Sequence, residues 1–181
     1  YYSGLVPCLT AALTAFGVTR LFDIAPTRFA IEAPALSADL LWRIAVLGIA
    51  CAVMSIVFCE VMHKGERFIS RTLRNPYLRA VAGGAVIIAL TYICGTTDYN
   101  GAGTAVIARA ITEGEARPAA FVLKLLFTAV TLGCGFRGGE VVPTFFIGAT
   151  LGCVLGPLLG IPAGFAAAVG LVALFCGAVN C

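Results

Sequence analysis

Long apolar stretches alternate with short polar connections along most of this chain. The stretches that we expect to be helical are residues 5–22, 40–74, 78–94, 119–133, 141–155 and 163–181. The hydrocarbon core of a bilayer requires roughly 20 apolar residues from each helix that crosses it, so the pattern allows about five or six crossings. The sequence therefore predicts an all-α, polytopic membrane protein.

Two of these stretches differ from a simple span. Residues 40–74 form one long candidate helix with a basic, amphipathic end, and Asn75-Pro76 stops it. The stretch that ends at Gly133 is interrupted by a glycine-rich break at 133–139, and the helix from Val141 to Leu155 is too short to cross easily alone. Broken apolar segments are typical of transporters and channels.

The remaining connections are polar and short. A short amphipathic stretch from Ala102 to Ile111 lies within the glycine-rich connection at 95–118. Gly156 to Pro162 is expected to turn the chain before the last apolar run, and residues 23–39 form a further polar connection.

Composition and charge placement agree with a membrane protein. The chain is 60% hydrophobic and 12% charged, whereas soluble domains carry about 25% charged residues. Basic side chains gather around one turn, at Lys64, Arg67, Arg71, Arg74 and Arg79. The positive-inside rule places this turn, residues 64–79, in the cytoplasm. We expect a multi-pass protein of the cell (inner or plasma) membrane, with lipid as its surroundings and no nucleic-acid partner.

Candidate metal, cofactor and enzyme chemistry is sparse. The eight cysteines stand singly within apolar stretches, where cysteine behaves as a small buried hydrophobe. The single histidine, His63, lies in a charged run, so we expect no metal site, no cofactor and no nucleophilic catalysis. The chain begins at Tyr1 without an initiator Met and ends within an apolar run, so we expect residues 1–181 to be an internal piece of a larger transmembrane domain.

The segment from Gly135 to Gly152 carries the most specific chemistry. Arg137, Gly138, Gly139 and Glu140 precede Pro143, and an apolar helix follows. Proline is favoured in the first turn of a helix, and glycines let a ligand approach the backbone closely. The open N–H groups and positive dipole end of a helix start attract anions. Within a membrane, this pattern predicts an anion site.

Several ionisable residues lie in or beside apolar runs, where such groups usually mark pathways or partners. Arg43 and Glu60 are close enough to helix ends to reach the interface. Lys124 lies deeper, where it either pairs with an acid or helix end or raises the potential near an anion path. Glu140 either serves the first helical turn electrostatically or exchanges protons. Burial would favour the neutral form of Glu140, whereas Arg137 and the helix start would favour its charged form.

These residues resemble the CLC family of chloride channels and anion/proton antiporters. Residues 138–143 are similar to the family's Gly-Gly-x-Phe-x-Pro element, and Phe146 to Gly152 to the helix that follows it. Lys124 to Gly135 resembles the basic-residue helix that leads into that element. Asn100 to Gly103 resembles a glycine-rich outer turn of the family. The resemblance implies a homodimeric, all-helical CLC-like bundle with broken or re-entrant helices, two inverted repeats and one anion pathway per subunit. This chain would hold most of the second repeat.

The resemblance also implies roles for residues. The backbone amides of Glu140 and Val141, cradled by Gly138 and Gly139, would bind the anion, with Lys124 and Arg137 as supporting charges. The leading expectation is chloride transport, by a channel or a chloride/proton antiporter. The Gly-Gly-Glu-Val sequence resembles the fluoride/proton antiporter branch, in which Glu140 would take part in proton coupling. A transporter of another family or a non-conducting membrane scaffold is the alternative of another class.

Overall fold

The computed structural model describes residues 2–22, 29, 31, 33–35, 37–73 and 75–179. The chain divides into two units, residues 1–30 and 31–181. The described helix of the first unit is α1 (Tyr2–Leu21), whose apolar side chains from Val6 onward are mostly exposed. Most of the predicted polar connection at 23–39, together with Arg74 and the last two residues, lies outside the described residues.

All regular secondary structure in the described part of the second unit is α-helix, which confirms the predicted all-α class. Its helices are α2 (Ala38–Thr72), α3 (Pro76–Cys94), α4 (Thr104–Thr112), α5 (Ala120–Gly133), α6 (Val141–Leu158) and α7 (Ala163–Val179). These bounds agree with the apolar stretches to within a few residues, because Pro, Gly and polar caps mark most of the ends.

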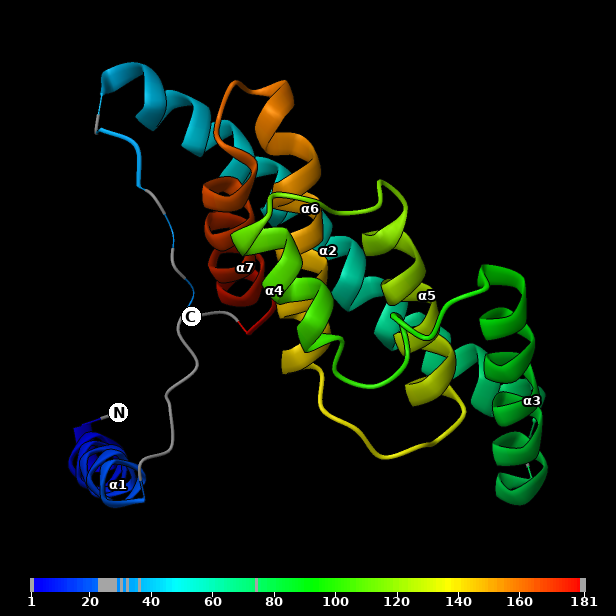
Figure 1. Cartoon of the computed structure of the whole chain (residues 1–181). Helices are drawn as coiled ribbons and strands as arrows, with labels where there is room; N and C mark the ends of the chain where they lie inside the picture. The colour runs from blue at the N-terminus through cyan, green and yellow to red at the C-terminus, as the bar shows by residue number, and fades with distance from the viewer. Residues whose placement is uncertain are drawn as a thin grey trace. The chain divides into compact units, whose positions relative to one another are not determined.

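The long helix α2 runs behind α7, α6 and α5 and contacts all three (Figure 1). The Ser37 hydroxyl accepts a hydrogen bond from the Leu40 N–H at 3.1 Å and caps its start. Its buried face includes Leu47, Cys51 and Phe58 at almost regular helical spacing. With 35 residues, α2 extends about 52 Å at 1.5 Å per residue, well beyond the hydrocarbon core.

Helices α6 and α7 form a closely packed antiparallel pair (Figure 1). Glycines make the close packing possible: a Cβ on Gly148 would meet the backbone of Gly170, and one on Gly152 would meet the backbone at Ala166. Small residues let two membrane helices approach until their backbones touch. Most residues of α6 from Thr144 to Gly156 are buried.

The end of α6 differs from the prediction. The helix continues through Gly156 and Pro157 to Leu158, three residues beyond the expected end at Leu155. The turn, expected over Gly156 to Pro162, is made around Gly160, which has a φ of 66°. The Arg43 guanidinium holds this turn by donating hydrogen bonds to the carbonyls of Leu159 at 3.0 Å and Gly160 at 3.2 Å.

Three described helices are long and apolar enough to cross a membrane: α2, α3 and α6. Shorter apolar helices cover Val6–Leu21, Ala120–Gly133 and Ala163–Val179. With 14 residues, α5 extends about 21 Å, which is less than the hydrocarbon core. The break predicted after Gly133 therefore separates a short helix from the buried helix α6, as in a re-entrant arrangement.

Candidate functional site

The chain reverses its direction between α5 and α6, so that the two helices form a hairpin (Figure 1). Gly135, with a φ of 85°, adopts the left-handed conformation that starts the reversal. The amides of Cys134, Gly135 and Phe136 still bond to carbonyls of α5 at 2.9 to 3.3 Å. Residues 137–140 then continue without such bonds to the start of α6, where they are exposed.

The first N–H groups of α6 are open. The Thr144 amide bonds to the Glu140 carbonyl at 3.2 Å, and Pro143 has no N–H to donate. The amides of Gly138 through Val142 donate no hydrogen bond to the described residues. They stand at the positive end of an 18-residue helix, a position that binds anions in many proteins.

Glu140 occupies the cap position of α6 without capping it. Its backbone is helical, with φ −86° and ψ −18°, and its side chain makes no cap hydrogen bond. A capping side chain needs an extended backbone to fold back onto the first turn, which explains the missing bond. The carboxylate is exposed, and no described cation forms an ion pair with it, Arg137 included.

Lys124 is a buried cation, with only 2% of the residue exposed. Its Nζ donates to the backbone carbonyl of Tyr99 at 3.0 Å and to that of Gly101 at 2.6 Å, and it lies 5.0 Å from the Phe146 ring centroid. Its direct hydrogen bonds therefore go to neither an acid nor a helix end, the partners that the sequence suggested. They go to the glycine-rich turn before α4, and the Phe146 ring of α6 adds a cation–π contact.

A cavity of about 670 Å³ joins Lys124 to the start of α6. Gly138, Gly139, Val142 and Pro143 line it from the α6 side, and Phe136 lines it from the break. The other walls come from α3, α5 and the turn at residues 99–102. The structure thus brings together three of the six predicted site residues: Lys124, Gly138 and Gly139.

The other three predicted residues, Arg137, Glu140 and Val141, lie outside the lining of this cavity and are exposed. Val142 and Pro143 line it instead, and the sequence analysis assigned no ligand role to either. Which side of a helix start faces a cavity depends on the rotation of the helix, and the motif does not determine this rotation. The sequence feature that could have indicated the opposite wall of the cavity was the glycine-rich segment at residues 100–103.

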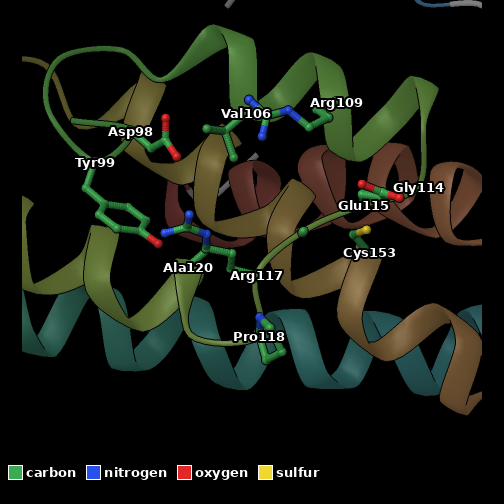
Figure 2. Close-up of a pocket in the computed structure, with 11 residues that line it drawn as sticks. Asp98, Tyr99, Val106, Arg109, Gly114, Glu115, Arg117, Pro118, Ala120 and Cys153 are labelled. Atoms are coloured by element: carbon green, nitrogen blue, oxygen red, sulfur yellow. The ribbon is translucent and has the colours of Figure 1, made fainter. Parts of the chain in front are cut away.

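A second, polar pocket of about 560 Å³ lies between the turn at Asp98 and Tyr99, α4, and the connection before α5 (Figure 2). Its lining carries Asp98, Arg109, Glu115 and Arg117, and the described residues form no ion pair among these four. Tyr99 lines both pockets. None of the six predicted site residues lines this polar pocket, and three of its four charged residues are exposed, as is usual for solvated side chains.

Comparison with known proteins decides the family. The family model described as voltage gated chloride channel matches residues 1–181. The chain belongs to this family. The predicted CLC resemblance is thereby confirmed, and the apolar helices are those of an integral membrane protein.

Two CLC relatives show how much of the family fold is present. A chloride/fluoride channel protein of Pseudomonas syringae pv. tomato (strain ATCC BAA-871 / DC3000) is 35% identical over 186 residues, covering 99% of this chain and 41% of that protein. The crystal structure of a CLC-type fluoride/proton antiporter matches with a TM-score of 0.89 and 29% identity, over 97% of this chain and 45% of that chain. The chain therefore spans less than half the length of these two relatives.

Proposed function

We propose that this chain forms part of the pathway of a CLC anion transporter, and that the start of α6 binds the transported halide. The observation that carries the proposal is the row of open amides from Gly138 through Val142 at the positive end of a buried helix. Amide groups replace the hydration shell of an ion without trapping it as a fixed opposite charge would. The binding residues proposed are Gly138, Gly139, Glu140 and Val141.

Lys124 and Arg137 supply the supporting positive charge in this proposal. Lys124 lines the same cavity as Gly138 and Gly139, but two backbone carbonyls already hold its ammonium group. It therefore acts on the anion through space, as a fixed positive potential. Arg137 is exposed beside the open amides, where it attracts anions toward the helix start.

The proposal extends to the whole protein. We expect residues 1–181 to be part of a larger transmembrane domain, working as a homodimer in the cell membrane with the turn at 64–79 in the cytoplasm. Support comes from the family and from the exposed basic side chains Lys64, Arg67 and Arg71 around this turn.

The test of the anion site is Gly139→Leu in the full-length protein that contains this chain. A Cβ on Gly139 meets no heavy atom within 4 Å, so the side chain is accommodated without a clash at its base. We expect normal folding and a strong loss of halide efflux from proteoliposomes, because the side chain occupies the space in front of the amides. Gly48→Leu is the matched control, since a Cβ there is equally free. Wild-type efflux from the Gly139 variant would exclude this site.

A second candidate function is fluoride/proton antiport, and the free carboxylate of Glu140 favours it. The group neither caps α6 nor pairs with a described cation, and it is exposed beside the open amides. The CLC-type fluoride/proton antiporter among the structural relatives is consistent with this candidate.

Efflux measured with fluoride, chloride and pH electrodes separates the candidates. Fluoride efflux coupled to proton uptake, with coupling lost in Glu140→Gln, would support antiport. Chloride efflux with an unchanged proton flux in Glu140→Gln would leave Glu140 an electrostatic role at the helix start. A full-length protein without any anion flux would favour the scaffold alternative.

A further inference from the structure

Arg79 differs from the other basic residues near the turn at 64–79. Lys64, Arg67 and Arg71 are exposed on α2, whereas Arg79 lies near the start of α3 and is partly buried. Its guanidinium lies against the backbone of Gly135: a Cβ built there would be 2.8 Å from Nη2, 3.3 Å from Nε and 3.4 Å from Cζ. A Cβ at position 135 would therefore require the end of the Arg79 side chain to shift.

The position of Arg79 is unfavourable for its own helix. A cation close to a helix N-terminus is repelled by the helix dipole. In addition, its Nε is buried and has no hydrogen-bond partner among the described residues. A compensating attraction comes from the C-terminal end of α5, where the dipole is negative, because Gly135 lies two residues after Gly133, the last residue of α5.

A second residue of α3 contacts the same segment. Gly83, the buried residue of α3, lies one helical turn after Arg79. A Cβ on Gly83 would lie 2.6 Å from the Cys134 Sγ and 3.3 Å from the Phe136 ring. Arg79 and Gly83 therefore lie against three consecutive residues, Cys134 to Phe136, and Phe136 in turn lines the cavity beside Gly138 and Gly139.

We propose that Arg79 is a positioning residue, whose planar guanidinium fixes Cys134 to Phe136 so that the amides at the start of α6 face the anion. This inference rests on the proposed function for its link to transport, and on contacts within the chain for the positioning itself. The shape of the group matters as well as its charge, because a guanidinium is a planar group and a lysine ammonium is a compact point charge.

The test uses Arg79→Gln and Arg79→Lys in the full-length protein, with Arg71→Gln as the control for loss of an exposed charge. The first readout is the rate at which a maleimide labels Cys134, which is only 6% exposed. Variants that also carry Cys134→Ala give the background from other cysteines. We expect faster labelling of Cys134 in both Arg79 variants and an unchanged rate in Arg71→Gln.

The second readout is halide affinity by calorimetry. We expect both Arg79 variants to bind halide about tenfold more weakly, the order expected when a supporting residue of an ion site is removed, and Arg71→Gln to match the wild type. Wild-type labelling and affinity in Arg79→Gln would overturn the proposal, as would full rescue of both by Arg79→Lys. Faster labelling in a protein that binds no halide would retain the positioning role and reject the proposed function.

Discussion

Replacing Lys124 by methionine tests the electrostatics of the candidate site most directly. Methionine keeps most of the length of the side chain and removes the positive charge. A sphere of 670 Å³, the volume of the cavity that Lys124 shares with Gly138 and Gly139, is about 11 Å across. At an effective dielectric constant of about 20, a unit charge acts on an anion over that distance with about 1.5 kcal/mol. This corresponds to roughly a tenfold loss of affinity.

Lys124→Met changes the free energy of unfolding by two contributions of opposite sign. The Tyr99 and Gly101 carbonyls lose their donor, which costs about 1–3 kcal/mol for a buried group. Removing a buried ammonium group also ends its desolvation penalty of several kcal/mol. Anion affinity is therefore the quantity to measure, with thermal unfolding in detergent to establish that the variant is folded.

The assay is halide binding by calorimetry, followed by efflux from proteoliposomes over a range of halide concentrations. Lys124→Arg keeps the charge and is expected to remain within about threefold of the wild type, a difference below 1 kcal/mol. Lys64→Met is the control for an exposed cation, since Lys64 has a 78% exposed side chain and pairs with Glu60 at 2.6 Å. Wild-type affinity in Lys124→Met would refute the idea that this charge acts on the site.

Three further predictions concern the framework around α6, each measured as thermal unfolding in detergent. Gly152→Val is expected to destabilise the protein by about 1–3 kcal/mol or prevent folding, because its Cβ meets the α7 backbone at Ala166; a wild-type melting temperature would contradict this packing. Arg43→Met is expected to cost about 1–3 kcal/mol by removing the donors to Leu159 and Gly160, and an effect below 0.5 kcal/mol, the lower end for one hydrogen bond, would contradict it. Ser37→Ala is expected to cost about 1 kcal/mol through the lost cap of α2, whereas Ser37→Thr should retain most of it.

The helices were predictable because local residues determine most of their ends. Asn75 caps α3 through its side chain, Pro76 follows at the first helical position, and a glycine-rich segment separates α5 from α6. The end of α6 was not predictable in this way, since Gly156-Pro157 reads locally as a stop. The turn comes later, around Gly160, where Arg43 donates hydrogen bonds to carbonyls more than 110 residues further along the chain.

The candidate site was predictable in its chemistry and only partly in its geometry. Glycines, an acid and a proline before an apolar run are local signals of a helix start that binds anions. The partners of Lys124 are not local, because the Tyr99 and Gly101 carbonyls precede it by 25 and 23 residues in a separate turn. No spacing rule connects a lysine within a helix to carbonyl groups of a preceding loop.

Lys124 and Glu140, two ionisable groups of the proposed site, differ in what holds them, and this difference suggests different roles. Lys124 is buried, has two carbonyl acceptors and lies over the Phe146 ring, so its charge is fixed in place. Glu140 is exposed at the end of a helix and has no described partner. A transporter that exchanges protons needs one group that changes its charge and a surrounding potential that does not change. On the proposed function, Glu140 suits the first role and Lys124 the second.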